Sequence, residues 1–90
     1  MHIGKITGTV VATRKNDDLI GCKLMIVQPL NSKLQPKGEV MVAVDTVGAG
    51  IGEVIIYASG TAARIAAKKR DSPIDLAIVG IVDAIDVVDE

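Results

Sequence analysis

The chain has few of the residues that cross-link or anchor a protein. It contains a single cysteine, Cys22, so a disulfide framework is excluded. No apolar run approaches the roughly 18 residues that a transmembrane helix needs. The first residues also lack the long apolar stretch of a secretion signal. One free thiol without such a signal is typical of a reducing compartment, so we expect a cytoplasmic protein with no membrane partner.

Aromatic residues are nearly absent, because Tyr57 stands alone and there is no Phe or Trp. Proteins that stack nucleic-acid bases use several aromatic side chains. The charges are balanced, with 10 Lys and Arg against 11 Asp and Glu and a net charge of −1. A protein that binds the phosphate backbone is normally basic. We therefore expect no nucleic-acid partner.

The sequence lacks a combination of residues suited to catalysis. A nucleophile needs a base beside it, and the only histidine, His2, lies at the chain end, whereas Cys22 lies in an apolar segment. One His and one Cys are a poor ligand set for zinc. The acidic residues late in the chain are spaced like solvated charge: Asp83, Asp86, Asp89 and Glu90. We expect a protein that is not an enzyme and that uses neither a metal nor a cofactor.

A glycine-rich segment in the middle of the chain carries Gly48, Gly50 and Gly52. In a dinucleotide-binding fingerprint the third glycine comes one residue later and a helix follows, whereas here the β-rich residues 53–58 follow. A phosphate-binding P-loop would end in Gly-Lys-Ser/Thr, which the chain lacks. The glycines are better explained as places where backbones approach closely or turn sharply.

β-Branched residues dominate what the chain does contain. Twelve Val, twelve Ile and five Thr make 29 of the 90 residues, and such side chains favour strands. The pattern predicts strands within residues 2–14, 22–30, 41–44, 53–58 and 76–82, the last of them buried on both faces. We expect the first two strands to pair antiparallel, with a bulge or bend at Gly4 or Gly8.

A single helix is predicted in the alanine-rich stretch 59–70. Ser59 or Thr61 can cap its start, the cations at its end complement the helix dipole, and the segment 71–73 should stop it. No linker, repeat or low-complexity segment divides the chain, so residues 1–90 should form one domain. The elements together predict a mainly β protein, a small OB-like β-barrel of five or more strands with one short α-helix.

The chain is more apolar than a small fold can easily conceal. Hydrophobic residues make up 49% of it, nine glycines come in addition, and the mean hydropathy is +0.42. The core of a 90-residue domain is too small to bury all of these apolar side chains easily, whereas contacts between subunits can bury the remainder. We therefore expect a homo-oligomer. Arg64 in the predicted helix suits a carboxylate of another subunit, since its planar guanidinium pairs bidentately. A solvated position on the helix surface is the alternative for this side chain.

Five segments resemble a known family in their order and spacing. They are Gly8–Thr13, Gly21–Leu30, Val44–Val54, Ser59–Arg64 and Pro73–Asp83. Together they resemble the vertex proteins of bacterial microcompartments, of the EutN/CcmL type, from about residue 1 to residue 86. The most specific of them contains the run Asp-Thr-Val-Gly-Ala-Gly-Ile-Gly-Glu, residues 45–53.

The resemblance implies an OB-like barrel whose five copies form a ring at the vertices of a polyhedral protein shell. Hexameric shell proteins would be its partners, and the shell would enclose enzymes in the cytoplasm. The segment that lies near the five-fold axis and the subunit contacts would be Gly48, Ala49, Gly50, Ile51, Gly52 and Glu53. Arg64 and Asp83 match family positions and are further candidates for subunit contacts. The alternative is a small OB-type binding module for a ligand or an oligonucleotide, which would need exposed aromatic residues and a basic groove.

Overall fold

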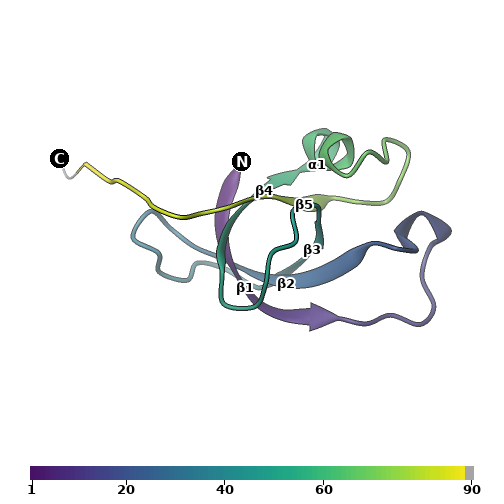
Figure 1. The fold of residues 1–90 in the computed structure, drawn as a ribbon, viewed down its shortest axis with the longest axis horizontal. Helices are drawn as coiled ribbons and strands as arrows, with labels where there is room; N and C mark the ends of the chain where they lie inside the picture. Colours follow the sequence, from purple (N-terminus) through teal and green to yellow (C-terminus); the bar gives the residue numbers. More distant parts are fainter. Residues whose placement is uncertain (89–90) are drawn as a thin grey trace.

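The computed structural model describes residues 1–88 and shows five strands, one α-helix and one 3₁₀ turn (Figure 1). The elements are β1 (His2–Val10), η1 (Asp17–Leu19), β2 (Lys23–Pro29), β3 (Met41–Asp45), β4 (Val54–Ser59), α1 (Gly60–Ala66) and β5 (Leu76–Ile81). The predicted mainly β class with one short helix is confirmed. Four of the five predicted strands agree with the structure to within about two residues.

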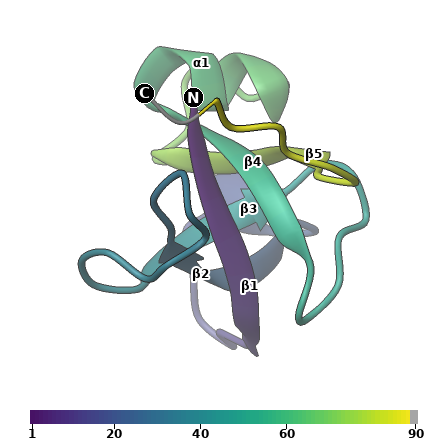
Figure 2. The same cartoon turned by 90° about the vertical axis from the view of Figure 1, so that its left-hand side faces the viewer.

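The strands close into a barrel in the order β1-β2-β3-β5-β4 (Figure 2). The predicted antiparallel pairing of the first two strands is confirmed, and every other neighbouring pair is antiparallel except β3 and β5. These two run parallel and share only the pairs Val44–Ala77 and Asp45–Ile78. β5 therefore fills the gap between β3 and β4, and its contact with β3 is the shortest in the barrel.

The first strand is shorter than the pattern predicts, because it ends at Val10 and not near residue 14. A bulge interrupts its pairing with β2 between Ile6 and Gly8, which confirms the predicted irregularity at Gly8. Gly4 has a separate role. A Cβ built on Gly4 would lie 2.5 Å from Cγ1 of Val27 and 3.1 Å from Cε1 of Tyr57. Only glycine fits at this crossing of β1 over the barrel interior.

The core lies inside the barrel and is built from alternate residues of the strands. Its fully buried large side chains are Ile6, Met25, Val27, Ile55 and Ile78. A second cluster lies between α1 and the sheet, where Ala63 of the helix packs with Val44, Ile74 and Ala77. Within β5, Ala77 and Ile78 are buried, but Ile81 is 38% exposed. The expectation of burial on both faces therefore holds only for the first half of this strand.

The helix also ends earlier than predicted, at Ala66. Ser59 occupies the cap position, yet no side-chain hydrogen bond from it caps the helix. Beyond Ala67, Lys68 adopts a left-handed conformation with φ of 59°, which turns the chain away from the helix axis. The prediction that residues 71–73 stop the helix is wrong, since the turn at Lys68 has already done so.

The last part of the chain leaves the barrel. The backbone N–H of Val82 donates to the carbonyl of Val54 at 2.9 Å. After that bond, residues 83–88, here called the C-terminal arm, contain no helix or strand and extend from one end of the molecule (Figure 1). With the arm included, the molecule measures 47 × 23 × 22 Å.

Candidate subunit-interface site

The glycine loop, residues 46–53, connects β3 to β4 and contains all six loop residues predicted from the sequence. Its first half is held by the side chain of Asp45. One carboxylate oxygen, Oδ1, accepts hydrogen bonds from the backbone N–H groups of Val47 at 3.0 Å and Gly48 at 3.1 Å. Gly48 has a φ of 76°, a conformation that favours glycine. This loop entry is therefore a defined turn and not a loose connection.

The second half of the loop is closed by Glu53. Oε1 of Glu53 accepts from the N–H of Gly50 at 2.6 Å, and the N–H of Glu53 donates to the carbonyl of Gly50 at 3.2 Å. The loop is also tied to β1, because Gly52 donates to the carbonyl of Ile6 at 2.8 Å and Ile6 donates to the carbonyl of Glu53 at 3.0 Å. The loop is thus a rigid extension of the barrel wall.

The loop side chains divide into one that points inward and two that point outward. Ala49 is 1% exposed and belongs to the barrel core of its own subunit. Ile51 is 65% exposed and Val47 is 40% exposed. The apolar side chains that this loop can offer to a neighbouring copy are therefore those of Ile51 and Val47.

Arg64 lies on α1 and is already engaged within its own chain. Its Nη1 donates to the carbonyl of Ile74 and its Nη2 donates to the hydroxyl of Thr61, both at 3.2 Å. The first bond ties the helix to the segment that leads into β5. The guanidinium has further N–H donors, so a bidentate pair with a neighbour remains chemically open to it.

Asp83 is exposed and is the first residue of the C-terminal arm. Within one subunit it does not form a cluster with the glycine loop and α1. The loop and the helix lie on opposite sides of the barrel in both ribbon views (Figures 1 and 2), and Figure 1 shows the arm at one end of the molecule. A cyclic ring uses two different surfaces of each subunit, so interface residues need not be neighbours in one copy.

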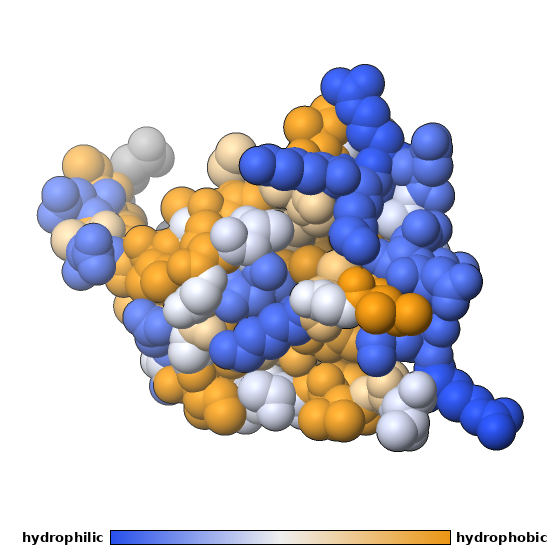
Figure 3. Space-filling view, turned by 45° about the vertical axis from the view of Figure 1, so that its right-hand side comes forward, coloured by the Kyte–Doolittle hydropathy of each residue, from blue (hydrophilic) through white to orange (hydrophobic). Residues whose placement is uncertain are grey.

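Apolar side chains are exposed on several elements. Besides the loop residues, Val42 on β3 is 51% exposed and Ile65 on α1 is 50% exposed. The space-filling view shows hydrophobic surface between hydrophilic side chains, while hydrophilic side chains gather toward the end that carries η1 (Figure 3). The excess of apolar residues read from the composition therefore lies partly on the surface, where another subunit can cover it.

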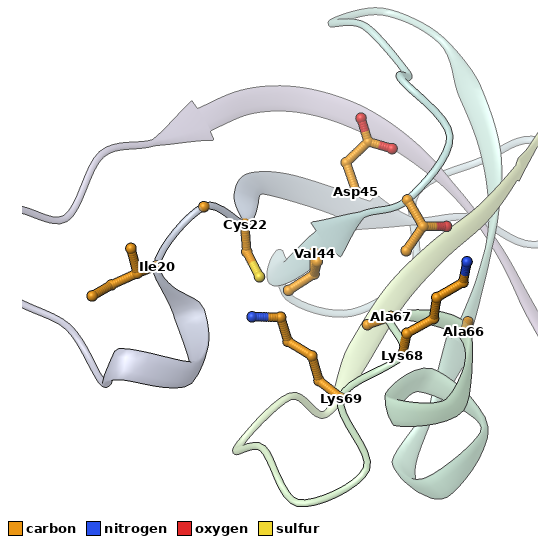
Figure 4. Close-up of a pocket in the computed structure, with 10 residues that line it drawn as sticks. Ile20, Cys22, Val44, Asp45, Ala66, Ala67, Lys68 and Lys69 are labelled. Carbon is orange, nitrogen blue, oxygen red and sulfur yellow. The ribbon is translucent and has the colours of Figure 1, made fainter.

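A hollow of about 360 Å³ lies between the start of β2, the end of β3 and the turn after α1 (Figure 4). Lys69 reaches across it, and its Nζ donates to the carbonyl of Asp18 at 2.7 Å. Lys69, one of the three basic residues 68–70 that follow the helix, thus holds η1 against the barrel. Cys22 lines the same hollow.

Other candidate residues take part in structure. His2 stacks on Tyr57 with ring centroids 5.1 Å apart, and burial raises the pKa of the Tyr57 phenol. Because Tyr57 is 4% exposed, the sole aromatic side chain of the chain does not form a base-stacking surface. Among residues 1–88, no three His, Cys, Asp or Glu side chains gather in a way that could hold a metal ion. Asp89 and Glu90 lie outside the described residues.

Two residues of the site were missed by the sequence analysis, namely Asp45 and Thr46. The Thr46 hydroxyl donates to the carbonyl of Ile78 at 2.6 Å, which fastens the loop entry to β5. An Asp at the end of a strand, three residues before a glycine, is a known signal for a side-chain-bonded turn and could have identified Asp45. The partner of Thr46 is 32 residues away in the sequence, and no local signal points to it.

Within the described residues, no helix is both long enough and apolar enough to cross a membrane.

The chain matches one family model, described as "Ethanolamine utilisation protein EutN/carboxysome", over residues 1–83. It is 51% identical over 88 residues to the bacterial microcompartment shell vertex protein GrpN of Rhodospirillum rubrum, with 98% of this chain and 99% of that protein covered. It is 45% identical to the carboxysome shell vertex protein CcmL of Synechocystis, with 97% of this chain and 87% of that protein covered.

The fold of this chain is also similar to that of a solved structure. The structure described as the GrpN pentameric microcompartment shell protein from Rhodospirillum rubrum superposes with a TM-score of 0.89, at 50% identity, over 98% of this chain and all of that chain. Both the sequence and the fold are therefore shared along nearly the whole length. The chain belongs to the EutN/CcmL family of bacterial microcompartment shell vertex proteins.

Proposed function

We propose that this protein is a structural shell protein whose five copies form a ring at the vertices of a bacterial microcompartment. The observation that carries the proposal is the likeness to GrpN, which is described as pentameric and matches 98% of this chain in sequence and fold. The whole chain acts as one vertex domain. The ring closes the shell around encapsulated enzymes in the cytoplasm.

The role follows from geometry. A flat layer of six-fold units cannot close on itself, whereas a five-fold unit removes a wedge of the layer and introduces curvature. Twisted strands closed into a rigid barrel give each subunit a fixed shape, so the ring has a defined outline. Hexameric shell proteins are therefore the partners at the outer rim of the pentamer.

The glycine loop is our candidate for the contacts near the five-fold axis. Its backbone is fixed by Asp45 and Glu53, and it presents Ile51 and Val47 outward. Five copies of Glu53 would bring five carboxylates into one ring, but each already accepts a hydrogen bond from Gly50 in its own loop, which satisfies part of the charge. Water molecules or cations between the five carboxylates would reduce the repulsion that remains.

Arg64 and Asp83 are our candidates for contacts farther from the axis. The first lies on α1 and keeps free N–H donors, and the second lies where the arm leaves the barrel.

A structural role needs no substrate, and we propose that the protein acts without a catalytic centre and without a nucleic-acid or membrane partner. The basis is the structural role of the family's shell proteins and the balanced charge of the chain.

The native mass of the purified chain tests the proposal. A pentamer of 9.4 kDa subunits has five times that mass, 47 kDa, and native mass spectrometry separates it from other ring sizes. Co-expression with hexameric shell proteins should then give closed particles, and omission of this chain should give open sheets or tubes. A chain that stays monomeric at high concentration would contradict the proposal and favour a ligand-binding barrel.

A further inference from the structure

The C-terminal arm is an extended segment, and within residues 1–88 no strand of its own subunit pairs with it. It begins directly after the bond between Val82 and Val54, and it continues with alternating acidic and apolar residues. Val87 is 50% exposed and Val88 is 88% exposed. Two apolar side chains at the end of an acidic, extended segment are costly to leave in water. The arm therefore has the composition of a segment that docks on another surface.

The end of the molecule opposite the arm is formed by the end of β1, the start of β2 and their connection (Figure 1). A hollow of about 360 Å³, here called the hairpin-end hollow, lies where β1 ends and β2 begins. Its lining is Thr9, Val10, Val11, Ala12, Lys15, Cys22, Lys23 and Leu24. It combines apolar side chains with two lysines, and Val11 at its margin is 92% exposed. The hollow is thus complementary to the arm in both charge and polarity.

The backbone beside the hollow is also available. β1 pairs with β4 only as far as Lys5, and the glycine loop bonds it at Ile6. From Gly8 to Val10, β1 has β2 on one side, and within the described residues no strand or loop bonds its other edge. An open strand edge of this kind accepts an extended peptide by backbone hydrogen bonding.

The charges of the C-terminal arm and of the opposite end of the molecule differ in sign. Residues 14–23 and 68–71 together carry six Lys or Arg and three Asp, whereas residues 82–88 carry two Asp and no basic residue. In a cyclic ring each subunit meets its neighbour with two different surfaces, which must complement each other. The arm and the end that carries the β1–β2 connection satisfy that condition, and one copy cannot bring them together because they lie at opposite ends of its long axis.

We propose that the C-terminal arm of each copy docks in the hairpin-end hollow of the next copy and so links the subunits of the ring. Asp83 and Asp86 face the lysines of the hollow, Val87 and Val88 cover Val11, and the arm lies along the open edge of β1. The proposal rests on the pentamer proposed above and names the contact that joins its subunits. It also gives Asp83 its role as the first acidic residue of the arm.

A disulfide cross-link tests the contact directly. In a Cys22→Ser background, the double variant Val11→Cys/Val87→Cys carries one thiol in the hollow and one in the arm. Because a disulfide requires Cα atoms within about 7 Å, oxidation should join neighbouring copies and give a ladder up to a covalent pentamer. The control is Val42→Cys/Val87→Cys, since Val42 is also an exposed valine, at 51%, but lies on β3. A ladder that is absent, or equal in both variants, overturns the proposal.

Truncation after Val82 gives a second measurement. The shortened chain keeps the bond between Val82 and Val54, so its circular dichroism and barrel stability should be unchanged. Its pentamer should dissociate at a concentration about tenfold or more higher than that of the full chain. If the full chain is a pentamer and truncation leaves its dissociation unchanged, the arm contact is refuted while the vertex function stands. If the full chain is itself monomeric, both proposals fail.

Discussion

Glu53 accepts a hydrogen bond from the backbone N–H of Gly50 at 2.6 Å and returns one to its carbonyl at 3.2 Å. This reciprocal pair closes the tip of the glycine loop and leaves Ile51 between the two residues pointing outward, 65% exposed. The carboxylate thus has a local structural task besides any contact that it makes in the ring. Substitutions of Glu53 can therefore test the effect of its hydrogen bond on loop shape separately from the effect of its charge.

Replacement of Glu53 by Ala should loosen the loop without unfolding the barrel. The lost charge-assisted hydrogen bond is worth about 1–2 kcal/mol in the free energy of unfolding. Glu53→Gln should lose less, because the amide oxygen still accepts from Gly50. Hydrogen exchange at the Gly50 amide, together with denaturant unfolding at fixed protein concentration, measures both effects. Equal exchange rates in Glu53→Ala and the parent chain would contradict the role assigned to the carboxylate.

A bulky charge at Gly50 should prevent ring assembly while the barrel remains folded. A Cβ at Gly50 would lie 3.3 Å from Oε1 of Glu53, so the backbone tolerates a side chain with a small adjustment. Gly50→Arg should therefore give a folded chain of lower native mass, and the control Gly50→Ala should keep the parent mass. If Gly50→Arg forms the same oligomer as the parent, the glycine loop does not lie in the packed interface.

Gly4→Ala should destabilise the barrel itself. The new Cβ would lie 2.5 Å from Cγ1 of Val27 and 3.1 Å from the carbonyl oxygen of Gln28, which is backbone and cannot rotate away. Such overpacking costs about 1–3 kcal/mol in the free energy of unfolding. The control is Gly80→Ala, whose nearest contact of 3.9 Å to Ile56 is ordinary. Similar thermal midpoints for the two variants would rule out a steric requirement at Gly4.

Tyr57 should make the barrel sensitive to alkaline pH. Burial raises the pKa of its phenol above the usual value near 10, so the folded chain keeps a proton that the unfolded chain loses. This contribution to the free energy of unfolding is full below about pH 10 and decreases as pH rises from there through the folded pKa. Tyr57→Phe keeps the ring stacked on His2 and should remove this part of the pH dependence. Identical slopes in both proteins above about pH 10 would contradict it.

Most of the secondary structure could be predicted because it depends on local properties. Val, Ile and Thr favour strands wherever they cluster, and the bulge at Gly8 was signalled by a glycine inside a strand. The end of the helix could not be predicted, because the left-handed turn at Lys68 depends on how the chain returns to the barrel. The bond from Lys69 to the carbonyl of Asp18 joins residues 51 positions apart and has no local signature.

The candidate site was predictable in place but not in detail. The glycine pattern located the loop, and the family resemblance gave it a role. Which side chains face outward depends on the barrel: Ala49 turns into the core, while Ile51 turns to the surface. For Arg64 the sequence predicted a contact with another subunit, whereas the structure shows hydrogen bonds to Ile74 and Thr61 of the same chain. The position of an arginine in the sequence does not distinguish these two kinds of contact.

The position of β5 in the strand order has a consequence for how the protein is made. β5 is the last strand in the sequence, yet it lies between β3 and β4 and completes the barrel. Until residues 76–81 have emerged from the ribosome, the nascent chain presents two open strand edges. The subunit therefore acquires its final shape only after synthesis of this strand, so incomplete chains cannot enter a growing shell as finished corners.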